Sequence, residues 1–160
     1  MTNVLFLCTG NSARSILAEA ILGRVGEGRF AAFSAGSRPA GRVNPVAVTL
    51  LEAKGFDVSG FRSKSWDEFA GDGAPRMEIV ITVCDSAASE SCPVWVGHPV
   101  TVHWGIPDPA AVTGDEATVR AAFEEAYATL EARLEKLVRL DCHSLSSSEI
   151  KAALREIAGS

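Results

Sequence analysis

Short apolar runs alternate along the chain with stretches of helical periodicity, and this alternation restricts the fold more than any other feature of the sequence. Four runs, Val4–Leu7, Phe30–Ala35, Met77–Val83 and Val100–Trp104, have the length and composition of buried strands. Strands separated by helices favour a parallel sheet with right-handed crossovers and helices on both faces. We therefore predict an α/β fold with a single domain on a four-stranded parallel sheet.

The helices between and after these strands are predicted from apolar spacing and from capping residues. Asparagine followed by proline is a favourable helix start, and serine with a glutamate three residues later is a capping box. The predicted helices are one through Ile16 and Leu22 that ends near Gly26, one from Asn44-Pro45 to Gly55, a short one at Ser65–Phe69, a long amphipathic one over Asp115–Arg139, and a last one that follows Ser146-x-x-Glu149 and runs through Ile157.

The composition argues against two classes of function. Of 160 residues, 15 are Lys or Arg and 20 are Asp or Glu, which gives a net charge of −5 with no strongly basic window, so we do not expect nucleic-acid binding. No apolar run approaches the ~20 residues that cross a bilayer, so we do not expect a membrane protein. The chemistry is assigned to a domain over residues 1–140, and residues 141–160 are assigned to a C-terminal helical tail.

The four cysteines are Cys8, Cys84, Cys92 and Cys142. The first residues, Met1–Val4, lack the features of a signal peptide, so we expect a cytoplasmic protein. In that reducing compartment cysteines are more often catalytic, metal-binding or inert than disulfide-bonded. The positions of the cysteines are therefore the strongest guide to function.

The segment Cys8–Ser15, with the sequence CTGNSARS, joins the first predicted strand to the first predicted helix. Five residues separate Cys8 from Arg14, enough for the backbone to curl around a tetrahedral oxyanion with its amides inward and the helix N-terminus beside it. Arg14 can hold two oxygens of that anion in a bidentate fork. The predicted oxyanion-binding residues are Thr9, Gly10, Asn11, Ser12, Ala13 and Arg14.

The same segment predicts a nucleophile. The positive charge around Cys8 is expected to lower the pKa of its thiol, so that a thiolate exists near neutral pH. Ser15 is placed to donate a hydrogen bond to that thiolate, and Asn11 to hold the loop through its side-chain amide. The alternative is a buried cysteine beside an arginine that happens to begin a helix. A nucleotide-binding P-loop is excluded, because no Gly-Lys-Ser/Thr follows the glycine turn.

Asp108 lies between two prolines, just after the fourth predicted strand. The prolines fix its backbone, which suits a general acid that protonates a leaving oxygen. Pro-Asp-Pro is also ordinary turn chemistry, which is the alternative. Because ligands bind at the carboxyl ends of parallel strands, we expect the topology to bring Cys8, Cys84 and Asp108 to one edge of the sheet.

Several motifs resemble one known family. Val4–Glu19, with Cys8-x5-Arg14-Ser15 at its centre, resembles the low-molecular-weight tyrosine phosphatases. Phe33–Gly36 and Asn44-Pro45 match further positions of that family. His103–Ala110, with the sequence HWGIPDPA, looks like its arsenate-reductase branch, and the similarity covers nearly all of residues 2–140.

The resemblance implies an enzyme that reduces arsenate to arsenite in arsenic detoxification, without a cofactor or a metal. Cys8 would attack arsenate while Arg14 holds its oxygens, and Asp108 would protonate the leaving oxygen. Cys84 would then attack Cys8 and release arsenite, after which Cys92 would attack Cys84. The implied partners are arsenate, with phosphate or sulfate as competing anions, and thioredoxin or glutathione with glutaredoxin as the reductant.

Some positions depart from that family. Thioredoxin-linked arsenate reductases often have another cysteine in the loop, where this chain has Ala13. Some members bind potassium beside the loop through an asparagine, a glutamate, a serine and an aspartate. Asn11, Glu19 and Ser34 match the first three, but Lys64 stands at the aspartate position. Because its ammonium can replace the ion electrostatically, we predict no potassium requirement.

Three alternatives stay open. A tyrosine phosphatase would also use Cys8 and Asp108, but Ala110 stands where an aromatic residue would sandwich the phosphotyrosine ring. A non-enzymatic regulator would bind oxyanions or a partner protein without turnover. A zinc site would have to use Cys84, Cys92, His98 and His103, whose spacing matches no common finger.

The remaining residues with distinctive chemistry are assigned to other roles. Cys142 and His143 follow the long helix near the tail, and we predict that both are non-catalytic. Trp66, Trp95 and Trp104 are predicted to pack in the core or in loops rather than to form a substrate platform.

Overall fold

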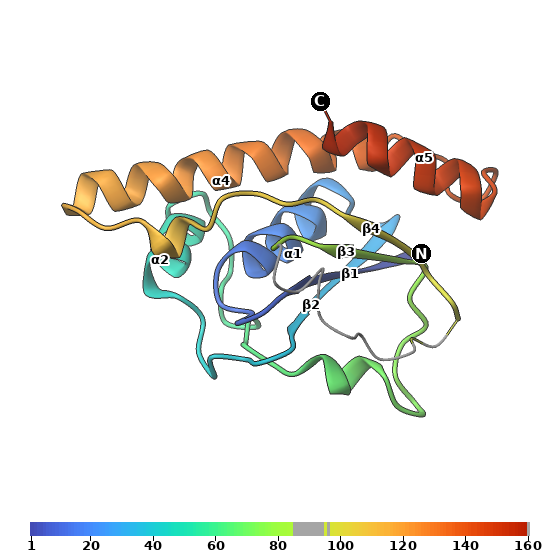
Figure 1. Cartoon of the computed structure of the whole chain (residues 1–160), viewed down its shortest axis with the longest axis horizontal. Coiled ribbons are helices and arrows are strands. Elements are labelled where there is room, and N and C mark those ends of the chain that lie inside the picture. Colours follow the sequence, from blue (N-terminus) through green and yellow to red (C-terminus); the bar gives the residue numbers. More distant parts are fainter. Residues whose placement is uncertain (85–94, 96, 160) are drawn as a thin grey trace.

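A computed structural model describes residues 1–84, 95 and 97–159, and these residues form the predicted α/β fold (Figure 1). Four parallel strands make one sheet in the order β2-β1-β3-β4. The strands are β1 (Thr2–Cys8), β2 (Phe30–Gly36), β3 (Ile79–Thr82) and β4 (Val100–His103). Both β3 and β4 are shorter than predicted, but all four predicted strands are present, and the predicted α/β class with one parallel sheet is confirmed. Helices lie on both faces of the sheet, although the α-helices of the described residues pack on one face and only a short 3₁₀ helix packs on the other.

The helices begin and end close to the predicted capping residues. Asn44 Oδ1 accepts a hydrogen bond from the N–H of Val46 at 2.8 Å, and Ser146 and Glu149 form the predicted capping box. None of the helices in the described ranges is long and apolar enough to cross a membrane. The α-helices are α1 (Arg14–Val25), α2 (Pro45–Ala53), α4 (Glu116–Leu137) and α5 (Ser147–Ala158), and the 3₁₀ helices are η1 (Trp66–Phe69) and η2 (Pro109–Ala111).

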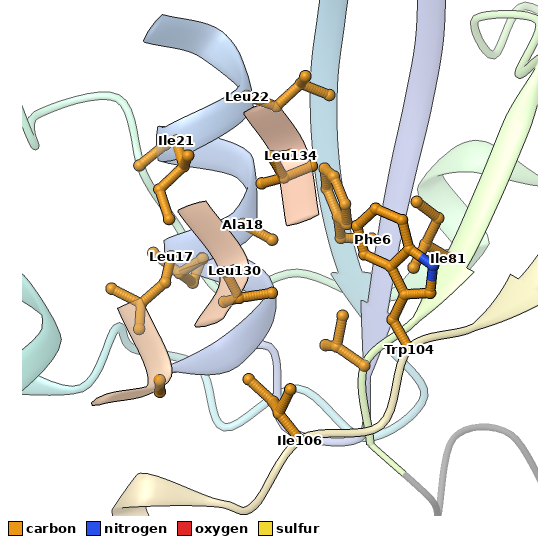
Figure 2. Close-up of a cluster of buried hydrophobic side chains, with 14 of the residues drawn as sticks. Phe6, Leu17, Ala18, Ile21, Leu22, Ile81, Trp104, Ile106, Leu130 and Leu134 are labelled. Atoms are coloured by element: carbon orange, nitrogen blue, oxygen red, sulfur yellow. The ribbon is translucent and has the colours of Figure 1, made fainter. Parts of the chain in front are cut away.

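Side chains of the central strand β1 alternate between two apolar clusters, one on each face of the sheet. Leu5 and Leu7 pack on one face with Phe69 of η1 and with Trp95. The larger cluster, on the other face, joins the sheet to α1, α2, α4 and α5. Its members labelled in Figure 2 are Phe6, Leu17, Ala18, Ile21, Leu22, Ile81, Trp104, Ile106, Leu130 and Leu134.

The tryptophans pack as predicted. Trp104 is fully buried in the larger cluster, and Trp95 is buried in the smaller one. Trp66 lies edge to face against Trp95, with 6.3 Å between the ring centroids. All three rings therefore serve the two cores of the molecule.

The strand register brings three segments to the carboxyl edge of the sheet. Cys8 at the end of β1 is paired with Gly36 at the end of β2. Beyond β3 the ladder continues, because Val83 N–H donates to the Leu7 carbonyl at 2.8 Å. Beyond β4, Trp104 N–H donates to the Thr82 carbonyl at 2.7 Å. The chain after each strand therefore leaves the sheet beside its neighbour, and this edge carries the candidate site.

Candidate active site

The loop of residues 8–15, here called the oxyanion loop, joins β1 to α1 at this edge. Its backbone turns at Asn11, whose φ of 45° lies in the left-handed region that asparagine tolerates better than most residues. The loop also passes very close to β2, since a Cβ on Gly36 would lie 2.4 Å from the carbonyl oxygen of Thr9. A side chain at position 36 would therefore displace the loop.

Three carbonyl groups of the oxyanion loop face outward, where the segment after β2 binds them. The three hydrogen bonds, each 2.9 Å long, run from the N–H groups of Arg38, Ala40 and Asn44 to the carbonyls of Thr9, Gly10 and Ser12 respectively. In a trans peptide the C=O and the following N–H point in opposite directions. The N–H groups of residues 10, 11 and 13 therefore point inward, as an oxyanion cradle requires, and the N–H of residue 11 donates to Cys8.

Asn11 is fully buried, and its side chain binds one residue within the oxyanion loop and two other parts of the chain. Its Nδ2 donates to Ser15 Oγ at 2.8 Å and to Ser34 Oγ at 3.0 Å. Its Oδ1 accepts from the backbone N–H of Lys64 at 2.9 Å. The side-chain amide thus holds the loop as predicted. Donation from Ser15 to Cys8 stays a prediction.

A half-buried ion pair lies behind Asn11. Ser34 Oγ donates to Glu19 Oε1 at 2.5 Å, and Lys64 Nζ lies 3.9 Å from the same oxygen. Burial raises the pKa of Glu19, while the Ser34 hydrogen bond and the Lys64 charge lower it. Burial lowers the pKa of Lys64, and the Glu19 charge raises it. The chain therefore supplies its own positive charge beside Glu19.

Arg14 begins α1 and reaches toward the segment after β4. Its Nη1 donates to the Ile106 carbonyl at 3.0 Å, and its Nη2 lies 3.5 Å from Asp108 Oδ2. Asp108 also caps η2, because its Oδ1 accepts from the N–H of Ala110 at 3.0 Å. Among the described residues, the buried Nε of Arg14 has no hydrogen-bond partner. That donor can serve an oxyanion in the loop.

Cys8 and Cys84 are buried side by side, with exposures of 6% and 3%, and their thiols are hydrogen-bonded. This hydrogen bond and burial raise the pKa of Cys8 far above its ordinary value, although the Asn11 N–H and the Arg14 charge lower it. The predicted lowering of the Cys8 pKa is therefore wrong for this arrangement. Two thiols this close titrate as a pair, because a charge on one makes the other hold its proton more tightly.

Other predicted residues lie away from this pair or outside the described residues. Cys92 lies outside the described residues. The predicted relay step and the zinc alternative both involve Cys92, so they also lie outside the described residues. Within the part of the chain that is described, no three His, Cys, Asp or Glu side chains form a cluster suited to a metal. Cys142 and His143 line a cavity with the first residues of β1, β3 and β4, at the opposite edge of the sheet from Cys8.

Sequence reasoning missed several contacts that shape the site. Thr9 Oγ1 lies 3.6 Å from Cys84 Sγ, and the Ser63 hydroxyl donates to the Gly10 carbonyl at 3.0 Å. The backbone N–H of Lys64 and the carbonyl of Ile106 also bind loop side chains. Any residue supplies these backbone groups, so no residue type signals them.

Comparison with known proteins agrees with this geometry. The sequence matches the family described as low molecular weight phosphotyrosine protein phosphatase over residues 3–152. An arsenate reductase from Bacillus subtilis is 34% identical over 133 residues, which are 83% of this chain and 92% of that protein. A glutaredoxin arsenate reductase from Synechocystis is 31% identical over 135 residues, which are 84% of this chain and 99% of that protein. The solved structure of an arsenate reductase from Archaeoglobus fulgidus is 32% identical, with a TM-score of 0.64 over 86% of this chain and 99% of its own. The chain therefore belongs to the low molecular weight phosphotyrosine protein phosphatase family.

Proposed function

We propose that the protein reduces arsenate to arsenite, with Cys8 as the nucleophile and Cys84 as the second thiol, and so serves arsenic detoxification. The observation that carries this proposal is the contact between the two buried thiols, at the edge where Arg14 meets Asp108. Hydrolysis of a phosphate ester needs a nucleophile, an anion site and an acid, but no second thiol. The names of the relatives, which are arsenate reductases, support the same choice.

In the first proposed step Cys8 passes its thiol proton to an arsenate oxygen and attacks the arsenic atom as the thiolate. The inward N–H groups of the oxyanion loop and the Arg14 guanidinium hold the oxygens and stabilise the charge that develops on them. One As–O bond breaks, and Asp108 gives a proton to the departing oxygen, which leaves as water. Arsenic is still As(V) in the resulting Cys8 adduct.

In the second step Cys84 passes its proton to an oxygen of the adduct, and its thiolate attacks the sulfur of Cys8. The S–As bond breaks with its electron pair on arsenic, so As(V) becomes As(III) and leaves as arsenite. The two thiols supply both electrons and become the Cys8–Cys84 disulfide. Thr9 Oγ1, 3.6 Å from Cys84 Sγ, lies within reach to donate to the attacking thiolate.

The proposed cycle closes by thiol–disulfide exchange. Cys92 attacks Cys84, which frees Cys8 and leaves a Cys84–Cys92 disulfide. An external thiol system then reduces that disulfide. Thioredoxin and glutathione with glutaredoxin are both suitable reductants, and a coupled assay with each one distinguishes them.

Cysteine variants separate these steps. Fully reduced protein is mixed with excess arsenate without external thiol, arsenite is counted, and the disulfides are mapped. The wild type should release about one arsenite per protein, a count set by the exchange stoichiometry, and end as Cys84–Cys92. Cys92→Ser should release the same amount and stop at Cys8–Cys84. Cys84→Ser should release none and keep arsenic on Cys8, and Cys8→Ser should not react.

Cys142→Ser is the matched control, because this half-buried thiol lies at the opposite edge of the sheet. It should match the wild type in arsenite count and in disulfide pattern. Arsenite release by Cys84→Ser at the wild-type rate would exclude the second step. Hydrolysis of phosphotyrosine by the wild type, with no arsenite formed, would assign the site to a phosphatase instead.

A further inference from the structure

The family match covers only the first half of helix α5. The family match ends at residue 152, inside α5, and the Archaeoglobus fulgidus structure matches 99% of its own length to only 86% of this chain. The helix nevertheless packs against β4 and α4 (Figure 1). It adds Ile150, Leu154 and Ile157 to the larger apolar cluster. Covering β4, the last strand of the sheet, is therefore one role of α5.

One contact of α5 reaches beyond this covering role. The indole Nε1–H of Trp104 donates to the backbone carbonyl of Leu154 at 2.9 Å. Both residues are fully buried. A buried indole N–H needs an acceptor, because leaving it unpaired away from water costs free energy. The position of α5 and the orientation of the Trp104 ring are thus tied together.

Trp104 is also the first residue of the segment that carries Asp108. Its own N–H continues the ladder from β3, and the N–H of Ile106 donates to the Val83 carbonyl at 3.4 Å. Figure 2 shows Trp104 and Ile106 pointing from this segment into the apolar cluster. Two residues later Asp108 meets Arg14. Trp104 therefore lies between α5 and the acid side of the site.

We propose that α5 is a positioning element for Asp108. By binding the Trp104 indole, α5 fixes how the segment of residues 104–108 leaves β4, and so where the Asp108 carboxyl lies over the oxyanion loop. Leu154 and Trp104 are positioning residues in this arrangement, because neither touches the reacting atoms. The inference rests on the proposed role of Asp108 as the general acid.

A shortened side chain in α5 tests this coupling in the full-length protein. Leu154→Ala weakens the packing of α5 against the larger cluster. The control is Leu22→Ala, which makes the same truncation in the same cluster but near the C-terminal end of α1. We expect Leu154→Ala to slow single-turnover arsenite formation by roughly threefold to tenfold, since small misplacements of a catalytic group are costly. The concentration of arsenate that gives the half-maximal rate should not change. Leu22→Ala should change neither quantity in the folded protein.

Trp104→Phe is the second variant, since it keeps an aromatic ring but removes the N–H that binds α5. It should slow arsenite formation in the same way as Leu154→Ala. If Leu154→Ala leaves too little folded protein, Ile150→Val provides a milder loosening of α5. The double variant Leu154→Ala/Asp108→Asn then shows whether α5 acts through Asp108. If it does, Leu154→Ala should cause no further loss of rate in protein that already carries Asp108→Asn.

The outcomes separate the two proposals. If Asp108→Asn alone leaves the rate unchanged, Asp108 is not the general acid, and the positioning role of α5 falls with it. If Asp108→Asn slows the reaction but Leu154→Ala does not, the role of Asp108 as general acid is kept, and the positioning role of α5 is overturned. A loss from Leu154→Ala that is equally large with and without Asp108 also overturns it. Equal slowing by Leu22→Ala would reduce the role of α5 to general stability.

Discussion

The oxyanion loop and the apolar layer between the sheet and helices α1 and α4 are both buried, but different forces hold them. In the layer, Leu17, Leu130 and Leu134 are fully buried and pack without a required direction. In the loop, fully buried Asn11 and Ser15 depend on hydrogen bonds of fixed direction. Damage to the layer should therefore reduce stability, whereas damage to the loop should reduce activity even in protein that stays folded.

Leu134→Ala tests the first half of this comparison. Truncation of a fully buried leucine leaves a cavity and typically costs about 2–5 kcal/mol of the free energy of unfolding. Denaturant unfolding should show that loss. Single-turnover arsenite formation per folded molecule should stay close to the wild-type rate. A large fall in that rate would mean that the layer also shapes the loop, and the comparison would break.

Gly36→Ala tests the second half. The added Cβ would lie 2.4 Å from the Thr9 carbonyl oxygen and 3.0 Å from the N atom of Asn11, so the loop must shift. A shift of this kind should slow arsenite formation by roughly 100-fold, as misplaced reacting groups do.

Gly23→Ala is the control for that variant. A Cβ on Gly23, within α1, meets nothing within 4 Å, and alanine favours the helix by about 1 kcal/mol. This variant should be fully active and somewhat more stable than the wild type. Wild-type activity in Gly36→Ala would show that the loop adapts, contrary to the contrast drawn between the two regions.

The same difference explains what the sequence could predict. Apolar spacing predicts the strands and helices because packing without direction needs only the right side of an element to be apolar. The sequence predicts a nucleophile at Cys8 and an anion-binding group at Arg14 because both lie in one short segment. Helix α5 was found from the capping box of Ser146 and Glu149.

The errors concern contacts between distant parts of the chain. The pKa of Cys8 was predicted in the wrong direction, because its hydrogen bond with Cys84 depends on how β1 pairs with β3. Likewise, Lys64 binds Asn11 through a backbone N–H, which no residue type reveals. Met77 was assigned to a strand because it is apolar, but it is buried in the smaller cluster just before β3 begins.

Lys64→Met tests the half-buried ion pair of Lys64 and Glu19 behind the loop. We expect it to cost about 1–2 kcal/mol, less than a fully buried pair, because Glu19 can take up a proton and keeps its contact with Ser34. Activity should fall less than in Gly36→Ala, since the backbone N–H that holds Asn11 is retained.

The pH dependence of that cost has a definite sign. Burial already raises the pKa of Glu19, and removal of Lys64 raises it further. A carboxyl whose pKa is raised by folding contributes stability below its unfolded pKa and loses it as pH rises through the folded pKa. The lowered pKa of Lys64 in the wild type acts in the same direction, since its contribution is lost as pH falls. The cost of Lys64→Met should therefore grow with pH.

This pH dependence is checked by measuring the free energy of unfolding over a series of pH values. The two proteins compared are Lys64→Met and the double variant Glu19→Gln/Lys64→Met. The double variant lacks the titrating carboxyl, so Lys64→Met should lose stability relative to it as pH rises. A difference between the two that is independent of pH would mean that Lys64 acts by packing alone.

Glu149→Gln should have the smallest effect, because it changes an exposed contact that belongs to neither region. Glu149 Oε1 accepts from the backbone N–H of Ser146 at 2.9 Å, and this hydrogen bond lowers the pKa of Glu149. A carboxyl whose pKa is lowered by folding contributes stability above its unfolded pKa and loses it as pH falls through the folded pKa. Glutamine can accept the same hydrogen bond without the charge. The Tm of the variant should therefore lie slightly below that of the wild type at neutral pH, and the two should converge in acid.

Glu156→Gln, in the last turn of the same helix, is the control. It should not lower Tm at neutral pH, because a negative charge there opposes the helix dipole. A Tm difference for Glu149→Gln that persists in acid would show that the amide fails to replace the hydrogen bond itself. The stabilising effect of Glu149 on α5 would then come from the direction of its hydrogen bond, as in the oxyanion loop, rather than from its charge.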